Sequence, residues 1–507
     1  MTDAVPAPAG RPGGGDDLVA ALRSVVEAGP GRPAVRDAAG EWRFGDLWER
    51  AGRVAGGLLD RLAVRPGARV GILGENSAEY LAAYFGILRA GCVAVPLNQL
   101  LRPEEHTAQL ELVGARDCLV GRDFLDERLG GSIRTVPITD VVAGPEPSSL
   151  PPVGPADDAT ILLTSGTTGR PKGAVQTHAT MRTAVAEMHA ALPFARDDVM
   201  LAFLPFFASI PEQILPSLLA GACVEVLPRF DLDRIADACD RATAFDAVPT
   251  LMARLIDGVP AARLSRLRWL MFASEPMPPA LLARWWEELP TVATYQFYGM
   301  TEMLTITAAG PELMREAPTS VGRPFPRSQV AVIGPDGAPA ATGDAGEVVC
   351  ASPARMRTYL PDGIDPATWR LADGSMRTGD LGRLDEAGRL HLTGRIKDII
   401  ISGGMNIAPS EIEAVAAEHP GVATSVVVGV PDARWGETPI LVVVAKAGQR
   451  LDPQELLRFC RGRVASYKRP RGVAIVESLP ATGIGKSSKA AIREHLLGGG
   501  VEVFRDA

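Results

Sequence analysis

Residues 164–173 read Thr-Ser-Gly-Thr-Thr-Gly-Arg-Pro-Lys-Gly, and this stretch decides how the rest of the chain is interpreted. Its glycines let backbone N–H groups turn toward one centre, its hydroxyls add donors, and Lys172 adds a positive charge. The apolar run 159–163 before it predicts a short buried strand that delivers the loop. Such a loop suits the phosphates of a nucleotide. The Walker A pattern Gly-x-x-x-x-Gly-Lys-[Ser/Thr] cannot be fitted to it, so a P-loop is not indicated.

The composition of the chain narrows the class of protein. A length of 507 residues predicts two or more domains. The net charge of −8 argues against bulk electrostatic binding to nucleic acid or to acidic membranes. The six cysteines are scattered without a Cys-x-x-Cys pair, so neither a disulfide framework nor a zinc site is indicated. We therefore expect an ordinary globular protein whose partners are small molecules.

The start of the chain does not have the pattern of a targeting segment. Residues 1–16 are rich in Pro, Gly and Ala and lack the basic start and apolar core of a signal peptide, which predicts a disordered tail. We find no uninterrupted apolar run of about 18 residues, the length that a transmembrane helix needs. The sequence thus predicts a cytoplasmic protein with no membrane or nucleic-acid partner.

Helical and strand patterns alternate along the N-terminal part of the chain. This alternation predicts an α/β fold in which helices cover parallel sheets. Over 318–395 the segments shorten and turns become frequent, which predicts a small, β-rich and mostly antiparallel module. The expected helices are 44–62 and 79–90, and the expected strands include 69–74, 92–96, 199–204, 223–227, 269–273 and 346–350.

A second, small α+β domain is predicted from Lys397 onward. Pro409 opens a helix there, with Ser410 as the expected N-cap and Glu413 at capping-box spacing. Strands are expected at 425–429 and 440–445. The predicted organisation is a disordered tail at 1–16, a large domain at 17–396, and a mobile C-terminal domain at 397–507.

Four more fragments follow the loop in a fixed order. They are Gln296–Glu302 (QFYGMTE), Arg377–Gly382 (RTGDLG), Gly394–Asp398 (GRIKD) and Leu479–Lys486 (LPATGIGK). Together with the loop they resemble the adenylate-forming superfamily of acyl-CoA synthetases, adenylation domains and luciferases, over about residues 17–495. The resemblance implies that a carboxylate attacks the α-phosphate of ATP, giving an acyl-adenylate and pyrophosphate. A thiol or another nucleophile then attacks the mixed anhydride.

The resemblance also implies roles for residues around the nucleotide. Thr301 would contact the α-phosphate, and Glu302 would hold Mg²⁺, which offsets charge on the leaving pyrophosphate. Tyr298 would stack on adenine. Asp380 would accept both ribose hydroxyls, and Arg395 would reach the ribose and phosphates. The β- and γ-phosphates would lie against Thr164, Ser165, Gly166, Thr167, Thr168, Gly169 and Lys172, and the other side of adenine against Ser274, Glu275 and Pro276.

Three further roles follow from the same resemblance. Lys486 would stabilise the charge that develops near the carboxylate and the α-phosphate during adenylation. Lys397 would be the hinge about which the small domain rotates between half-reactions. Gly403 and Gly404 would border the tunnel of the attacking thiol, since glycine allows close backbone approach.

The acid substrate is the open question. The predicted pocket is apolar, as for an aryl or medium aliphatic acid. Many family members place a histidine or an aromatic gate after Pro-x-Phe, whereas Ala208 stands there in this chain. Glu212 could recognise a donor-bearing group on the acid, although a solvated glutamate at a helix start is the expected role. The pocket candidates are Phe206, Phe207, Ala208, Ile210, Val248, Met300 and Leu304.

Three functions remain open on the sequence. The first is an acyl- or aryl-CoA synthetase, favoured by segments 96–105, 429–437 and 465–470, which resemble acyl-CoA synthetases more than amino-acid adenylation domains. The second is a stand-alone adenylate-forming enzyme that passes the acid, or another oxyacid such as nitrite, to an amine or a carrier protein. The third is a non-catalytic nucleotide-binding relative, disfavoured because Glu302, Asp380 and Lys486 are all present.

Overall fold

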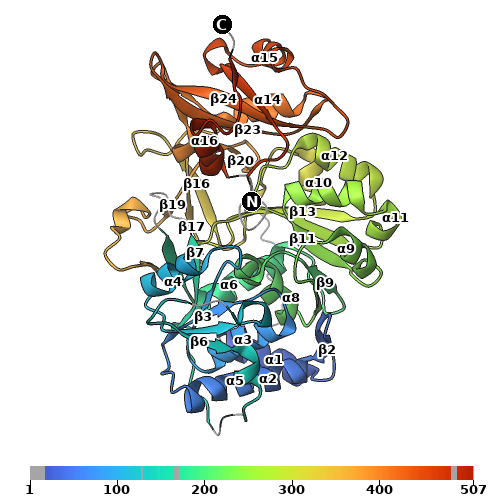
Figure 1. Ribbon diagram of the computed structural model, residues 1–507, viewed down its shortest axis with the longest axis vertical. Helices are drawn as coiled ribbons and strands as arrows, with labels where there is room; N and C mark the ends of the chain where they lie inside the picture. The colour runs from blue at the N-terminus through green and yellow to red at the C-terminus, as the bar shows by residue number, and fades with distance from the viewer. Residues whose placement is uncertain are drawn as a thin grey trace, which may run out of the picture.

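The computed structural model describes residues 17–126, 129–145, 147, 149–164, 171–480 and 488–505. Two large sheets with mostly parallel strands build its N-terminal part, as the alternating pattern predicts (Figure 1). Antiparallel strands flank one of them, sheet A, at both edges and the other, sheet B, at one edge. Sheet A runs β15 (Arg323–Pro324), β14 (Thr307–Ala309), β13 (Ala293–Tyr298), β12 (Trp269–Phe272), β11 (Ala244–Ala247), β9 (Val199–Ala202), β10 (Cys223–Val226), β1 (Pro33–Asp37), β2 (Gly40–Arg43). Sheet B runs β18 (Thr358–Leu360), β8 (Lys172–Thr177), β7 (Asp158–Thr164), β4 (Val93–Pro96), β3 (Arg69–Leu73), β5 (Asp117–Val120), β6 (Arg134–Pro137).

A layer of helices separates the two sheets, because its apolar side chains share one buried cluster with residues of both. Other helices cover the outer faces of the sheets. The middle layer holds α1 (Leu18–Ala28), α2 (Phe44–Gly56), η1 (Gly57–Arg61), α3 (Ala78–Arg89), α5 (Ile138–Val142), α6 (His178–Ala191), α7 (Phe206–Ser209), η3 (Ile210–Ile214) and α8 (Leu215–Leu219). The outer helices include α9 (Leu232–Ala238), α10 (Pro249–Gly258), α11 (Ala261–Leu264), α12 (Pro279–Glu288) and α13 (Pro311–Glu316) on sheet A, and α4 (Pro103–Leu112) with η2 (Arg122–Phe124) on sheet B.

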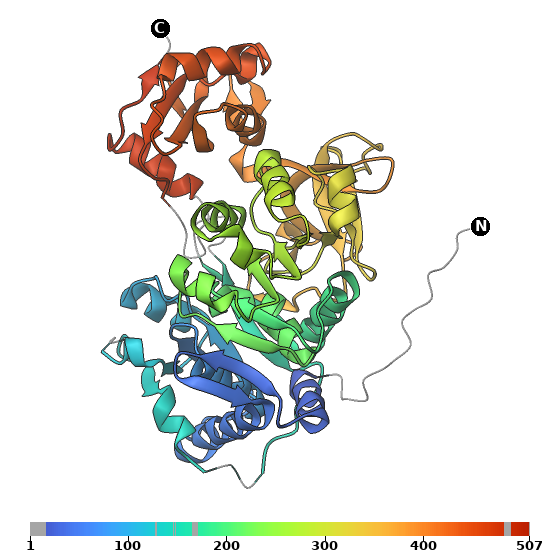
Figure 2. The same cartoon turned by 90° about the vertical axis from the view of Figure 1, so that its right-hand side faces the viewer.

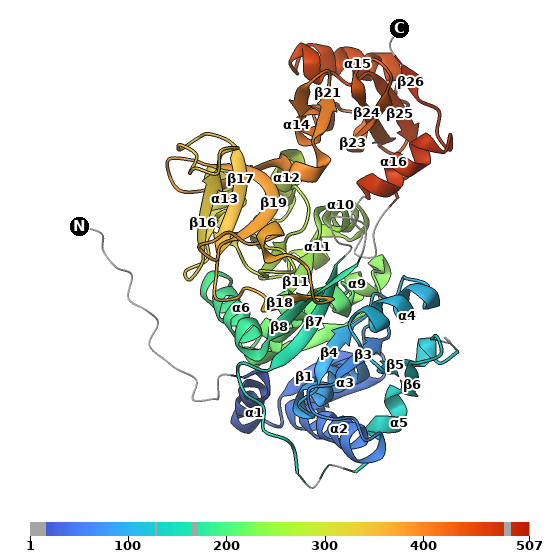
Figure 3. The ribbon, with the colours of Figure 1, turned by 90° about the vertical axis from the view of Figure 1, so that its left-hand side faces the viewer.

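Two smaller sheets complete the chain, and Figures 2 and 3 show the last of them at one end of the molecule, opposite α1 and α2. Sheet C is antiparallel throughout, as expected, and η4 (Pro366–Thr368) precedes its third strand. Its order is β16 (Gln329–Ile333), β17 (Gly346–Ala351), β19 (Met376–Leu384), β20 (Leu390–Arg395). After η5 (Ile396–Asp398), sheet D runs β22 (Met405–Ile407), β21 (Ile400–Ser402), β24 (Gly436–Ala445), β25 (Gly472–Val476), β26 (Phe504–Arg505), with β23 (Val422–Asp432) on β24. The helical elements around sheet D are α14 (Pro409–Ala417), α15 (Pro453–Arg461), η6 (Ser466–Lys468) and α16 (Lys489–Leu497).

The expected capping box of α14 is wrong. Ala408 is the N-cap and Pro409 fills the first helical position, where its missing N–H is tolerated. Ser410 lies inside the helix, and its hydroxyl donates instead to the carbonyl of Thr393 on β20. Glu413 accepts the N–H of Val427 at 2.8 Å and pairs with Lys489 at 2.8 Å. Contacts distant in the sequence have replaced the local cap.

All six cysteines are buried, and none of them forms a disulfide. Burial raises the pKa of the Cys92 thiol to about 12 and that of Cys239 to about 11. Among the described helices, none is both long and apolar enough to cross a bilayer. The tail predicted at 1–16 lies outside the described residues.

Candidate active site

The opening motif begins on a hairpin of sheet B. Thr164 ends β7 and is the cross-strand partner of Lys172, which begins β8. Ser165, Gly166, Thr167, Thr168 and Gly169 lie outside the described residues. The ammonium of Lys172 lies 5.0 Å from the ring centroid of Tyr359 on the neighbouring strand β18. The stem of the predicted phosphate loop is therefore fixed on three paired strands.

Two side chains of the same sheet hold Thr301 and Glu302. The Gln176 amide donates to the Thr301 carbonyl at 2.9 Å, and the Tyr359 hydroxyl donates to Glu302 Oε1. The Glu302 carbonyl accepts the N–H of Met356 at 2.7 Å. Burial and the Glu302 charge raise the pKa of Tyr359, so its hydroxyl stays a donor. Lys172 and Glu302 thus share Tyr359 as a common neighbour.

Tyr298, Asp380 and Arg395 form a connected group. The Tyr298 hydroxyl donates to Asp380 Oδ2 at 2.5 Å, and Arg395 Nε lies 2.9 Å from Asp380 Oδ1. Asp380 is 6% exposed and Arg395 is its cross-strand partner. A carboxylate has about four lone-pair positions, so both oxygens keep capacity for one more donor each. The Tyr298 ring is 8% exposed, and the role that the sequence predicts for it, stacking on adenine, stays a prediction.

The loops predicted to line the nucleotide contain strained backbone. Ser274 has φ 78° and Leu304 has φ 56°, values that non-glycine residues rarely adopt. A Cβ on Gly299 would lie 1.9 Å from the Leu304 carbonyl oxygen, so only glycine fits under that turn. Glu275 accepts from the hydroxyl of Thr250 at 2.7 Å, which ties its loop to the start of α10. Pro276, next in that loop, is exposed.

The predicted acid pocket is only partly assembled in one place. Phe206, Ile210 and Leu304 share one buried cluster, whereas Val248 and Met300 pack in two others. Phe207 and Ala208 are half-buried on α7. Asn76, 3% exposed, fixes the start of α7: it accepts the Phe206 N–H at 2.8 Å and donates to the Leu204 carbonyl at 2.9 Å. The structure thus gathers some candidates and separates others.

The remaining candidates lie after sheet C. Lys397 is exposed on the single turn η5. Gly403 and Gly404 form the tip of the β21–β22 hairpin, with φ 59° and 78°, and a Cβ on Gly403 would lie 2.7 Å from the Trp435 ring. Lys486 lies outside the described residues.

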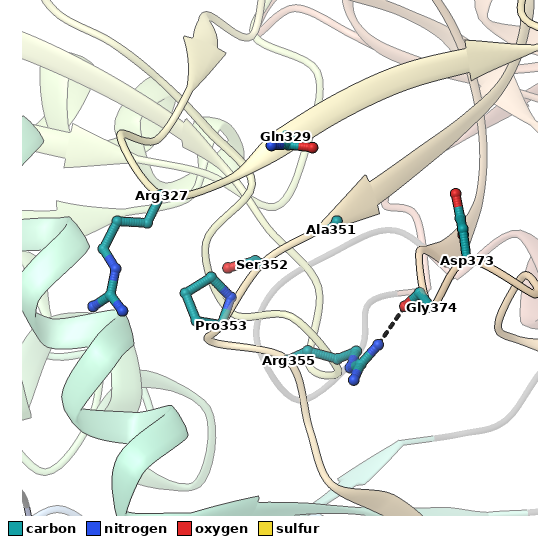
Figure 4. Close-up of a pocket in the computed structure, with 8 residues that line it drawn as sticks. All are labelled: Arg327, Gln329, Ala351, Ser352, Pro353, Arg355, Asp373 and Gly374. Atoms are coloured by element: carbon teal, nitrogen blue, oxygen red, sulfur yellow. Dashed lines mark hydrogen bonds between the residues drawn. The ribbon is translucent and has the colours of Figure 1, made fainter.

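A shallow pocket of about 380 Å³ lies at the edge of sheet C (Figure 4). The Arg355 guanidinium donates to the Gly374 carbonyl there, while the Arg327 side chain points away from it. None of the residues predicted from the sequence lines this pocket, so it does not belong to the candidate site. Its lining is Arg327, Gln329, Ala351, Ser352, Pro353, Arg355, Asp373 and Gly374.

Comparisons with known proteins agree with this geometry. Residues 22–360 match the AMP-binding enzyme family, and residues 411–486 match the AMP-binding enzyme C-terminal domain. A feruloyl-CoA synthase of an Amycolatopsis species is 36% identical over 482 residues, covering 92% of this chain and 96% of the relative. An indoleacetate–CoA ligase of Aromatoleum aromaticum is 33% identical over 501 residues, covering 92% of this chain and 95% of the relative.

The fold has solved counterparts of nearly the same extent. The crystal structure of ATP-bound MatB from Rhodopseudomonas palustris has a TM-score of 0.87 and 31% sequence identity, covering 95% of this chain and 98% of that one. The chain therefore belongs to the AMP-binding enzyme family, the adenylate-forming class that the five motifs indicate.

Proposed function

We propose that this protein is an AMP-forming acid–CoA ligase. It adenylates a carboxylic acid with ATP and then transfers the acyl group to coenzyme A. In the first step the carboxylate oxygen forms a bond to the α-phosphorus and the bond to pyrophosphate breaks. In the second step the thiolate of coenzyme A attacks the acyl carbon and AMP leaves.

One observation carries the proposal: polar residues from sheets A, B and C, of the kinds that an adenylation site requires, form two connected groups. Lys172 and Glu302 share Tyr359, while Tyr298 and Arg395 share Asp380. Phosphoryl and adenylyl transfer depend on positioning and on charge stabilisation more than on covalent protein chemistry. The two groups meet that need, because they contain hydrogen-bond donors, the buried carboxylates of Glu302 and Asp380, and the ammonium of Lys172.

The residues fit ATP and Mg²⁺ in chemical terms. Mg²⁺ is usually held by one or two carboxylates together with substrate phosphates, and Glu302 supplies such a carboxylate next to Tyr359, the neighbour of Lys172. A bound Mg²⁺ would neutralise charge on the pyrophosphate as it leaves. Asp380 would accept the ribose hydroxyls, Thr301 would meet the α-phosphate, and Lys486 would stabilise charge at the reacting carboxylate.

Coenzyme A as the acceptor is supported by a cationic and aromatic cluster beside the predicted thiol tunnel. The guanidinium groups of Arg434 and Arg471 lie 4.9 and 4.3 Å from the centroid of the Trp435 ring, and a Cβ on Gly403 would lie 2.7 Å from the same ring. Lys468 lies 5.5 Å from the exposed ring of Tyr467. Phosphates and a purine ring are the partners that arginines and aromatic rings prefer.

The domain division supports two half-reactions. The chain passes from sheet C to sheet D through η5, where Lys397 and Ile396 are exposed. A hinge needs a few residues that absorb a change of φ and ψ, and an exposed single turn meets that need. We therefore keep the boundary between 396 and 397, and we propose a cytoplasmic location for the whole protein.

The experiment is a panel of carboxylic acids, with nitrite as an oxyacid control, assayed with ATP and Mg²⁺ in the presence and absence of coenzyme A. We expect acid-dependent pyrophosphate release without coenzyme A, and a thioester by mass spectrometry when it is added. Pyrophosphate release without a thioester would instead indicate an enzyme that passes the activated acid to an amine or a carrier protein. If no acid causes pyrophosphate release, the protein would be a nucleotide-binding relative without ligase activity.

A further inference from the structure

The inner face of sheet A carries a buried carboxylic acid that the ligase reaction does not use. On β11 the side chains alternate, with Phe245 and Ala247 packed in the cluster under the outer helices. Asp246 therefore faces the other way, toward the middle layer. Its register partner on β12 is Met271, which shares a buried cluster with Met188 of α6. Asp246 is 2% exposed.

The position of Asp246 in the sheet is where a ligand is expected. β9 is followed in sequence by its neighbour β10, and the chain then crosses back to β11 on the other side of β9. Ligands of α/β sheets bind at the carboxyl ends of the strands at such a reversal. The β9–β11 pairing ends at Leu201 and Phe245, one residue before Asp246, whereas β11 continues to pair with β12. The two strands therefore part beside Asp246.

The carboxyl of Asp246 is not satisfied by the described part of the protein. Its Oδ2 has no hydrogen-bond partner among the described residues. Burial and the nearby Glu212 charge raise its pKa, while the Ala247 N–H opposes them, and none of these influences is a cation. A buried polar atom without a partner costs about 1–3 kcal/mol, so such an atom calls for a ligand or a function.

A second unpartnered acceptor lies on the facing π-helical turn η3, which follows Ala208. Gln213 is fully buried, and its amide N–H donates to the Leu201 carbonyl at 3.0 Å. Its Oε1 has no partner within the described residues. Leu201 is the register partner of Phe245, and neighbouring strands are about 4.8 Å apart, so the Gln213 amide lies beside the Asp246 position.

The same turn corrects one expectation from the sequence. Glu212 lies in the first turn of η3, as expected, but it is half-buried rather than solvated, and its charge acts on Asp246. A π-helical turn is rare and frequently occurs at functional sites. Within the part of the chain that the structure describes, Asp246 and Gln213 thus each present an unpartnered oxygen, and Glu212 is near enough for its charge to act on Asp246. Gln213 and Glu212 lie on η3, which follows α7, the helix that carries the predicted pocket residues Phe206 and Ala208.

We propose that Asp246, together with Gln213, binds a protonated amino group on the acyl part of the substrate. The nearby charge of Glu212 favours a cation there. This inference rests on the proposed ligase function for the carboxylate end of the acid. An alkylammonium group has three donors and no acceptor, so it can satisfy the two unpartnered oxygens of Asp246 and Gln213 at once. A methyl group satisfies neither of them, and a phenol hydroxyl donates to one. The substrate class is thus a carboxylic acid with an amine at the end remote from its carboxylate.

The test compares two pairs of acids with matched shape. The first pair is 4-(aminomethyl)benzoate and 4-ethylbenzoate, and the second is 6-aminohexanoate and heptanoate. In addition, 4-aminobenzoate serves as a neutral arylamine. Acid-dependent pyrophosphate release gives kcat/KM for each. A site that hydrogen-bonds a buried group rejects an analogue lacking that group strongly, so we expect a preference of about 100-fold or more for the ammonium-bearing acid of each pair. If 4-aminobenzoate is used as efficiently as the ammonium-bearing acids, the inference that the bound amine is protonated is overturned.

Three variants connect the preference to these residues. Asp246→Asn keeps the shape and should reduce the preference at least about tenfold, mainly through KM, since it removes the charge. Asp246→Leu should reverse the preference toward the apolar acids. Glu187→Gln is the matched control: Glu187 on α6 is 1% exposed and burial raises its pKa, but its carboxylate accepts the N–H of Arg327 instead of lying without a partner.

The outcomes separate the two proposals. Activity on apolar acids that is equal in the wild type and in Asp246→Asn, with no preference for amines, overturns this inference and leaves the ligase function intact. No pyrophosphate release with any acid overturns the ligase function itself. A shift in preference caused equally by Glu187→Gln would also overturn the assignment to Asp246.

Discussion

The role of Asp380 can be tested by coupling a mutation to a change in the nucleotide. The carboxylate already accepts from Tyr298 at 2.5 Å and from Arg395 at 2.9 Å, and it is 6% exposed. Asp380→Asn keeps the volume but replaces one acceptor oxygen by an NH₂ donor. If the ribose hydroxyls bind here, one of them then loses its acceptor.

The expected magnitude follows from the charge on the acceptor. A hydrogen bond to a charged group contributes about 1.5–3 kcal/mol. Asp380→Asn should therefore weaken AMP binding, measured by calorimetry, about 10- to 150-fold, because about 1.4 kcal/mol is a factor of ten. The Arg395 side chain is 52% exposed, so the loss of its ion pair should add no more than about 1 kcal/mol to the change in stability.

A double-mutant cycle removes the ambiguity between binding and folding. The wild type should lose affinity for the 2′-deoxy and 3′-deoxy analogues of AMP, whereas Asp380→Asn should lose much less, since the acceptor is already impaired. Tyr298→Phe is the matched control, because it removes a neighbour of Asp380 without changing the carboxylate. Additive losses in Asp380→Asn, with no coupling to either hydroxyl, would refute the ribose assignment.

Four further expectations follow from the site. Glu302→Gln should raise the Mg²⁺ concentration for half-maximal pyrophosphate release about 10- to 100-fold, while Tyr359→Phe should have a smaller effect; equal Mg²⁺ dependence would contradict the metal role. Lys486→Ala should abolish adenylation but largely spare thioester formation from supplied acyl-adenylate, and full adenylation by this variant would contradict its role. Lys397→Pro should slow steady-state thioester formation while a single round of adenylation survives; unchanged rates for both steps would remove the hinge. The pKa of Asp246 in the folded state lies above its value in the unfolded state, so between these two pH values the folded chain binds more protons. The free energy of unfolding therefore falls as the pH rises through this range. Asp246→Asn should flatten this fall in urea titrations and add up to about 1–3 kcal/mol at neutral pH, whereas a lower stability would contradict the unpartnered buried acid.

The sequence predicted those parts of the fold that depend on local patterns. The strand predicted at 69–74 is β3, and the helix predicted at 79–90 is α3. The antiparallel module predicted over 318–395 contains the four strands of sheet C, although β15 and β18 in that range pair in sheets A and B. Each has a periodicity or a turn frequency that is visible within a few residues. The five motifs indicated the family for the same reason, since each is a short contiguous segment.

What the sequence missed depends on residues far apart in the chain. Tyr359 reaches Glu302 across 57 positions, and Gln176 reaches Thr301 across 125. Neither has a local signature, because only the pairing of β8 with β18 brings them to the site. Ser410 failed as a cap because a partner on β20, 17 positions earlier, took its hydroxyl. Asp246 did leave a signal, a carboxylate inside the apolar strand Ala244–Ala247, which the apolar pocket prediction overlooked.

The six buried thiols have a practical consequence for measuring the enzyme. An aromatic disulfide reagent reacts with thiolates, and burial keeps Cys92, Cys239 and Cys350 protonated by raising each pKa to about 11 or 12. In the folded protein the reagent should therefore titrate free coenzyme A with almost no background from the chain. The number of thiols that react with the reagent should rise by six per chain when the protein unfolds, since all six cysteines are buried in the fold. One colour change thus measures both turnover and the fraction of intact enzyme.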